Sequence, residues 1–218
     1  MTETTIGPAC GTEAVGGVDI RIEEDASPIV RLIGRTIADS IRADGAVPDT
    51  VAGTVAIRSH DTPQAATITL TPGAIAVSSG VFVEPDLTMI VDLNQRFALV
   101  GELVGADDLA AATIALLAPP LPDWRTAAES FWAAARSVPG IPDVLIAITE
   151  GPDGLDQHVV GEGESHYVIA GPTELLAGIF SGADDLIAAL STGHIGVRGT
   201  FSQLSVLVAA SWKVRYDV

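Results

Sequence analysis

The sequence predicts an α+β fold in which antiparallel sheets of about five strands are each covered on one face by helices. Apolar residues recur at helical spacing on either side of groups of short alternating segments, which Pro and Gly separate. The order of these segments also repeats. Pro28 and residues 47–49 (VPD) return 94 residues later as Pro122 and residues 141–143 (IPD). The chain is therefore predicted to be internally duplicated.

The first half is predicted to contain a tail, a long helix and a meander of strands. Residues 1–17 are expected to form a flexible tail. Ser27 is a good N-cap and Pro28 a good first helical residue, and an apolar stripe continues from there to Gly45. The strands expected in this half are 18–22, 51–59, 66–71, 74–79 and 87–93, and residues 97–117 return to helical spacing.

The second half begins after a Pro-rich boundary at residues 119–122. A helix is predicted from Pro122 to residues 139–140, and strands follow at 144–149, 157–160 and 167–170. The face that this helix buries is predicted to consist of Trp124, Ala127, Ala128, Phe131, Trp132 and Ala135.

Two short helices are predicted directly before a strand in the last third of the chain. Thr173 is placed to cap the first helix, and Gly182 to end it. Asp184 and Asp185 are placed in the first turn of the second, where the helix dipole favours negative charge. The elements expected after them are a strand at 194–198 and a helical run at 204–210.

Two short motifs in the sequence resemble the sterol carrier protein type 2 (nonspecific lipid-transfer) family. Residues 193–199 read GHIGVRG, like the family's G-x-h-x-V-x-G strand after the helices that wall a lipid tunnel. Residues 85–89 read PDLTM, like its P-D-h-T-h strand before the helix pair. The resemblance implies two fused divergent sterol-carrier-like units, 18–121 and 122–218. Nothing like 193–199 follows the helices of the first unit, which is expected to lack one strand.

The resemblance also implies a function, namely binding or transfer of a lipid, fatty acyl or sterol-like ligand between helices and sheet. Burying about 16 methylenes at roughly 0.8 kcal/mol each is a gross gain near 12 kcal/mol, so no catalytic group is needed for binding. The predicted ligand-binding residues are Leu175, Leu176, Ile179, Phe180, Leu186, Leu190, Ile195, Val197, Phe201 and Leu204.

The C-terminal residues 212–218 alternate apolar and polar side chains, so they are predicted to form a strand. This strand either fills the gap in the first unit or extends the second sheet as an edge.

Composition limits the partners. The chain has 28 acidic and 11 basic residues and a net charge of −17, which opposes binding to nucleic acid and to anionic headgroups. No apolar run approaches the roughly 18 residues of a membrane span, so no stable membrane insertion is expected. Cys10 is the only cysteine and no secretion signal precedes it, which favours a reducing cytoplasm. The single lysine beside many Ala, Gly and Arg residues suggests a bacterial origin.

No pattern in the sequence predicts catalysis, a metal site or a cofactor. The pairs Asp107-Asp108 and Asp184-Asp185 are adjacent on helices, so their side chains diverge, and they are interpreted as first-turn dipole partners. The four histidines lack ligand spacing, the Gly-rich loop 150–164 is too acidic to hold phosphate, and no serine lies in a nucleophile motif.

Three functions remain open. The first is a non-enzymatic carrier of a small apolar ligand. The second is an enzyme-accessory module, because the resemblance extends to modules in mycothiol-dependent maleylpyruvate isomerases, although the N-terminal half lacks a His/Glu/His helix set. The third is a structural or oligomerising module, possible as a homodimer, whose cavity is filled by side chains.

Overall fold

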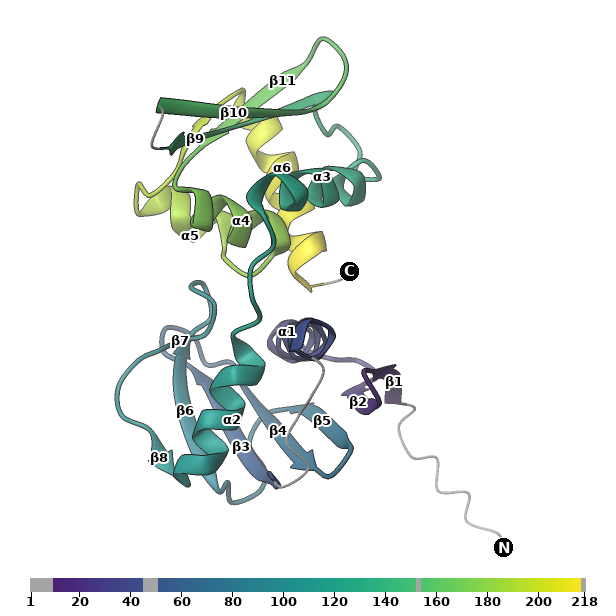
Figure 1. Cartoon of the computed structure of the whole chain (residues 1–218), viewed down its shortest axis with the longest axis vertical. Helices are drawn as coiled ribbons and strands as arrows, with labels where there is room; N and C mark the ends of the chain where they lie inside the picture. Colours follow the sequence, from purple (N-terminus) through teal and green to yellow (C-terminus); the bar gives the residue numbers. More distant parts are fainter. Residues whose placement is uncertain (1–9, 45–50, 152–153, 217–218) are drawn as a thin grey trace, which may run out of the picture. The chain divides into compact units, whose positions relative to one another are not determined.

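The computed structural model describes residues 10–44, 51–151 and 154–216 of the chain, which divides into two compact units. The first unit comprises the described residues up to Leu93 together with Phe97–Pro120. The second comprises Asn94–Arg96 together with the described residues from Leu121 onward. Each unit has its own sheet and its own helices (Figure 1).

The first unit is built on a mixed sheet with the strand order β1-β2-β5-β4-β3-β6-β7, and β8 also pairs with β6. Its described elements are β1 (Cys10–Val15), β2 (Val18–Glu23), α1 (Pro28–Asp44), β3 (Gly53–Ser59), β4 (Ala65–Thr71), β5 (Ala74–Ser79), β6 (Leu87–Asp92), β7 (Ala98–Leu99), β8 (Val104–Gly105) and α2 (Asp107–Leu117).

The predicted antiparallel meander is correct for β3, β4 and β5 but wrong for β6. β6 pairs in parallel with β3, with Val55 opposite Leu87 and Ile57 opposite Met89, and β2 pairs in parallel with β5. Burial alternates along β6, where Leu87, Met89 and Val91 are all buried. Alternation does not report which strand is the neighbour or in which direction it runs, so the sheet is mixed rather than antiparallel.

The long helix of the first unit follows its predicted apolar stripe. Ile29, Ile33 and Ile37 lie one turn apart on α1 and are at most 2% exposed. The hydroxyl of Ser40 donates to the carbonyl of Leu116 at 2.8 Å, which ties α1 to the end of α2. The predicted helix end at Gly45 and the motif at 47–49 lie outside the described residues.

Two predictions for the first unit are wrong. Residues 10–15 of the predicted tail form β1, which pairs with β2, whereas residues 1–9 lie outside the described part. Residues 97–105 are not helical but carry the short strands β7 and β8. Phe97, Gly101 and Gly105 have φ angles of 56°, 91° and 139°, and such left-handed backbone interrupts any right-handed helix.

The second unit contains a four-stranded sheet in the order β10-β9-β11-β12, with helices on one side (Figure 1). β11 is parallel to β9, and the other neighbours are antiparallel. The described elements are α3 (Trp124–Ala135), β9 (Val144–Gly151), β10 (Gly154–Gly161), β11 (His166–Ala170), α4 (Thr173–Ser181), α5 (Leu186–Ser191), β12 (Gly196–Arg198) and α6 (Phe201–Tyr216).

The core of the second unit lies between these helices and one face of the sheet. Leu145, Ala147, Tyr167 and Ile169 alternate along β9 and β11 and are fully buried on that face. All six residues predicted on the buried face of α3 are buried. The residues buried at helical spacing on α3 and those buried at every second position of β9 and β11 therefore form one core.

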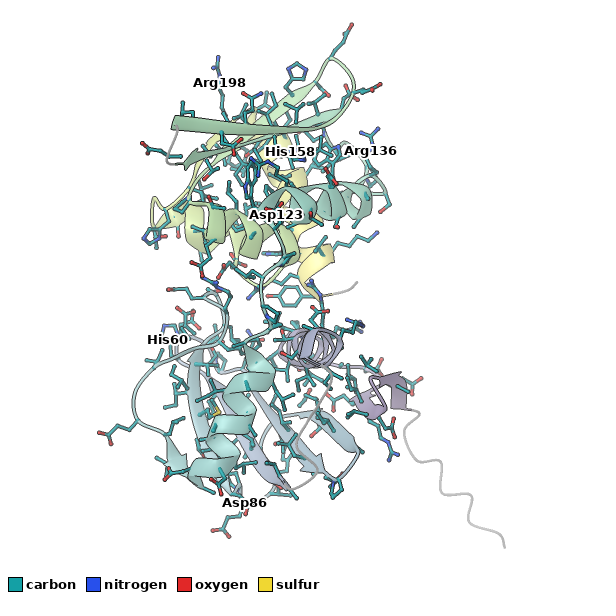
Figure 2. All side chains as sticks on the ribbon, viewed as in Figure 1. His60, Asp86, Asp123, Arg136, His158 and Arg198 are labelled. Atoms are coloured by element: carbon teal, nitrogen blue, oxygen red, sulfur yellow. The ribbon has the colours of Figure 1, made fainter. Side chains whose placement is uncertain are left out.

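The aspartates of two Pro-Asp segments hold strand ends in place. Asp86, at the bottom of the first unit in Figure 2, accepts the backbone N–H of Thr54 through Oδ2 at 2.8 Å and so fixes the start of β6 beside β3. Asp143 accepts the backbone N–H and the hydroxyl of Ser165 through Oδ2 at 3.0 and 2.7 Å. These hydrogen bonds lower the pKa of Asp143. Both aspartates are structural.

The predicted C-terminal strand is wrong, because residues 212–216 continue helix α6. The buried residues Leu207, Ala210, Ser211 and Arg215 stand at i, i+3, i+4 and i+8, which is the pattern of a helix packed on one face. The alternation of 212–216 was therefore a coincidence of composition, and neither predicted role for a strand applies there.

The two short helices before β12 are confirmed, but one predicted cap is wrong. Gly182 has a φ of 77° and ends α4 as a left-handed C-cap. Thr173 is the first helical residue rather than the cap, and its hydroxyl instead lies 2.9 Å from the hydroxyl of Thr149. Asp185 is the N-cap of α5, where it accepts the backbone N–H of Ala188 at 2.9 Å.

The duplication of the chain stays a prediction.

None of the described helices is both long enough and apolar enough to cross a membrane.

Candidate functional site

Nine of the ten predicted ligand-binding residues lie in or against one apolar cluster of the second unit. Leu176, Ile179, Phe180, Leu186 and Ile195 are at most 5% exposed. Leu175, Leu190, Val197 and Leu204 are partly buried and pack against the same cluster. Whether they contact a ligand stays a prediction.

Phe201 is the exception among the predicted residues. It is the first residue of α6, and 86% of it is exposed. The helical pattern of the sequence did not show on which side of α6 this ring would lie.

The seam between α3 and α4 is filled by aromatic rings. The centroids of Phe131 and Phe180 are 5.4 Å apart with the rings tilted by 41°, and both residues are at most 1% exposed. This is a favourable separation for two aromatic rings in a core. A ligand at this position would have to displace a side chain.

Two side-chain hydrogen-bond donors lie inside this core. The indole Nε1 of Trp132 and the hydroxyl of Tyr167 are buried and find no protein acceptor among the described residues. Burial raises the pKa of the Tyr167 hydroxyl, so it stays protonated as a donor. Groups of this kind usually have a protein or water partner, so they are the most polar points of an otherwise apolar interior.

An open hollow lies beside the core, where the parallel strands β9 and β11 both end. Its volume is about 600 Å³, within the range of ligand pockets. Its walls are Ile148, Thr149, Glu150, Leu155, Ala170, Gly171 and Pro172. Leu155 is 81% exposed and Glu150 is exposed, so both stand at the rim of the hollow, whose lining combines apolar side chains with a few polar groups.

A hydrogen bond joins one wall of the hollow to the start of α4. Thr149 lines the hollow and is itself buried, and its hydroxyl lies 2.9 Å from the hydroxyl of Thr173 at the start of α4. The sequence carried no motif for this hollow. It forms because two strand ends, a hairpin and the first residue before a helix meet in space.

Asp184 is a buried acid whose predicted place, in the first turn of the second short helix, is wrong. It precedes α5 and is 4% exposed, and its Oδ2 lies 3.2 Å from Nε of Arg96. Gly178 leaves room for it, since a Cβ there would lie 1.8 Å from that oxygen. Burial raises the pKa of Asp184, although Arg96 and Arg215 oppose the shift. Asp107 and Asp108, in contrast, lie in the first turn of α2 as predicted.

The raised pKa of Asp184 leads to a pH prediction. A carboxyl whose pKa is higher in the folded state stabilises the fold below the unfolded pKa and loses that contribution as the pH rises through the folded pKa. Asp184→Asn stays neutral throughout. We expect the stability of wild type relative to Asp184→Asn to increase between about pH 7 and about pH 4. Urea unfolding followed by tryptophan fluorescence measures it; a constant difference would contradict the assignment.

The histidines have local partners rather than a common one. His60 lies 3.9 Å from Asp61, His158 lies 3.1 Å from Glu129, His166 contacts the carbonyl of Gly163 and His194 contacts Thr192. Among the residues placed by the structure, no three His, Cys, Asp or Glu side chains are grouped so that they could hold a metal ion.

Comparison with known proteins finds similarity among solved structures. No family model and no curated protein matches the sequence. The solution structure of palmitated SCP2L2 from Aedes aegypti matches 41% of this chain and 95% of its own, with 16% identity and a TM-score of 0.34. Part of the chain is thus similar to sterol carrier proteins. The crystal structure of sterol carrier protein 2 like 2 from Aedes aegypti matches 38% of this chain and 92% of its own (17% identity, TM-score 0.31). The solution structure of a conserved hypothetical protein, possibly sterol carrier protein, from Thermus thermophilus matches 43% of this chain and 85% of its own, with 16% identity and a TM-score of 0.29.

Proposed function

We propose that the second unit binds a small uncharged apolar ligand, sterol-like or fatty-alcohol-like, in the hollow at the end of β9 and β11. The observation that carries the proposal is the hollow itself. It has a volume of about 600 Å³ and the apolar walls Ile148, Leu155, Ala170 and Pro172. Such a concave apolar site with a few polar groups is the usual form of a small-molecule site.

The charge of the site selects against anionic ligands. Glu150 stands at the rim, and the net charge of the chain is −17. A fatty acid carboxylate would be repelled by both. An alcohol, in contrast, can donate a hydrogen bond to the Glu150 carboxylate, and the bond to a charged acceptor is stronger than one between neutral groups.

We expect Ala170→Phe to weaken binding of a fluorescent sterol at least about tenfold, or roughly 1.4 kcal/mol. Ala170 lines the hollow at the end of β11, and a phenyl ring there fills the space that the ligand needs. Equilibrium titration of the full chain measures the affinity. Ala76→Phe, at an exposed position on β5, is the matched control and should bind as wild type does.

Glu150→Gln separates the effect of charge from that of shape. This substitution keeps the size of the side chain but removes the repulsion, so binding of a fluorescent fatty acid should improve more than binding of the sterol. If Ala170→Phe leaves sterol binding unchanged while Phe180→Ala alters it, the ligand lies among the predicted residues around Phe180 and not in the hollow.

A structural or oligomerising module without a ligand is the second candidate. It is supported by the packing of Phe180, a predicted ligand-binding residue, on Phe131 in the core of the second unit. Absence of any co-purifying lipid mass in native mass spectrometry, together with no saturable binding of either probe, would favour this candidate over the first.

A further inference from the structure

The four-stranded sheet of the second unit ends on one side at β10. In the described part of the chain β10 pairs only with β9, over all eight of its residues and without a bulge. Every second residue of such a strand directs its N–H and C=O groups away from its neighbour, where they can pair with another strand. Pro and Lys, which often block such edges, are absent from β10 (GLDQHVVG).

The sequence of β10 is self-complementary about Gln157. On either side of it lie first an acid and a base, Asp156 and His158, and then two apolar residues, Leu155 and Val159. In an antiparallel pair of identical strands with Gln157 opposite its own copy, Asp156 faces His158 of the second copy and Leu155 faces its Val159. A carboxylate that accepts a hydrogen bond from an imidazole, and apolar residues opposite one another, are favourable cross-strand combinations.

The side of β10 that faces the helices extends this charge pattern. Arg125 of α3 forms an ion pair with Asp156, and Glu129, one turn later on α3, lies 3.1 Å from His158. Figure 2 shows His158 on the helix side of the sheet. Across the two-fold axis the groups would follow in the order Arg125, Asp156, His158 of the second copy and Glu129 of the second copy. Acidic and basic groups then alternate along the row.

The other side of β10 supplies the apolar contact. Leu155 is 81% exposed and Val159 is 49% exposed, and neither is covered by a helix. Val159 lies opposite Ile146 of β9, which in turn lies opposite Val168 of β11. The apolar row that crosses the sheet therefore reaches the edge, where a second copy would continue it.

We propose that two copies of the chain associate through β10, antiparallel and centred on Gln157, and join their four-stranded sheets into one. A strand pair buries less than the roughly 1,200 Å² of a standard interface, so the dimer is expected to be weak and to appear between about 10 µM and about 1 mM. The proposal does not rest on ligand binding: Leu155 is shared with the hollow, but Gln157 and Val159, at which the tests below act, do not line it.

Sedimentation of the full chain over this concentration range is the first test. Wild type should change from monomer to dimer with concentration. Val159→Lys should stay monomeric, since it places a charge opposite Leu155 of the second copy. Val83→Lys, at a loop position that is 56% exposed, makes the same change in charge and should dimerise as wild type does. A monomeric wild type, or equal dimerisation of both variants, would overturn the proposal.

Disulfide trapping tests the register and does not depend on affinity. In a Cys10→Ser background, Gln157→Cys should form a disulfide-linked dimer rapidly, because residues directly opposite have Cα atoms about 4.5–5.5 Å apart. Leu155→Cys lies on the same strand and side but about 13 Å from its own copy, too far to bridge. Equal trapping of both variants, or faster trapping at residue 155, would show that β10 does not pair in this way.

Discussion

Arg215→Ala is expected to lower the free energy of unfolding of the second unit by about 3–5 kcal/mol. Arg215 lies near the end of α6 and is 2% exposed, an extreme position for a side chain that always carries a charge. Its Nη1 donates to the carbonyls of Gly182 and Ala183, each at 2.9 Å. It also attracts the buried carboxylate of Asp184.

The effect is large because several groups lose their partner together. The carbonyls of Gly182 and Ala183 follow directly after α4, where no helical N–H remains to satisfy them. Without the guanidinium these two carbonyls would lose their donor, and Asp184 would lose one of the two positive charges near it. The tight turn from α4 to α5 therefore depends on a side chain of α6.

Urea unfolding of the full chain measures this prediction, with tryptophan fluorescence as the signal. Trp124, Trp132 and Trp212 are the only tryptophans and all lie in the second unit. Arg215→Lys keeps the charge but not the planar fork, so an intermediate loss is expected. Arg198→Ala removes an exposed arginine and should change stability by no more than about 0.5 kcal/mol. Equal effects at 198 and 215 would show that burial of Arg215 does not matter.

Local periodicity was enough to predict most of each helix and much of the core. The stripe of α1, the buried face of α3 and the break at Gly182 each depend on residues within a few positions of one another. Turn chemistry likewise separated most strands correctly. Local patterns fail where they fit two structures equally well. Residues 212–216 alternate as a strand would, but they continue α6, which packs on the core.

The candidate site could not be predicted in the same way, because its contacts are distant in sequence. Arg96 reaches Asp184 across 88 positions, and its neighbour Asn94 accepts the backbone N–H of Asp185 at 3.1 Å. No spacing rule relates these residues. The hollow is likewise made of three short pieces of chain, and its residues carry no motif. The predicted apolar residues were found together, but mostly as core.

Phe180→Ala is expected to lower the free energy of unfolding by about 3–5 kcal/mol, which is the usual cost of truncating a buried phenylalanine. Phe180 is 1% exposed and its ring packs against Phe131 between α3 and α4. Removing the ring loses the transfer free energy of its carbons and leaves a void that the surrounding helices close only in part.

Phe201→Ala is the matched control, since Phe201 was predicted to share the same site but is 86% exposed. It should change stability by at most about 0.5 kcal/mol. The double variant Phe131→Ala/Phe180→Ala should cost less than the sum of the single variants, because both remove the same ring contact. Urea unfolding with and without a fluorescent sterol completes the test. A small loss for Phe180→Ala, recovered when the sterol is added, would show that the core around Phe180, a predicted ligand-binding residue, opens to hold the ligand.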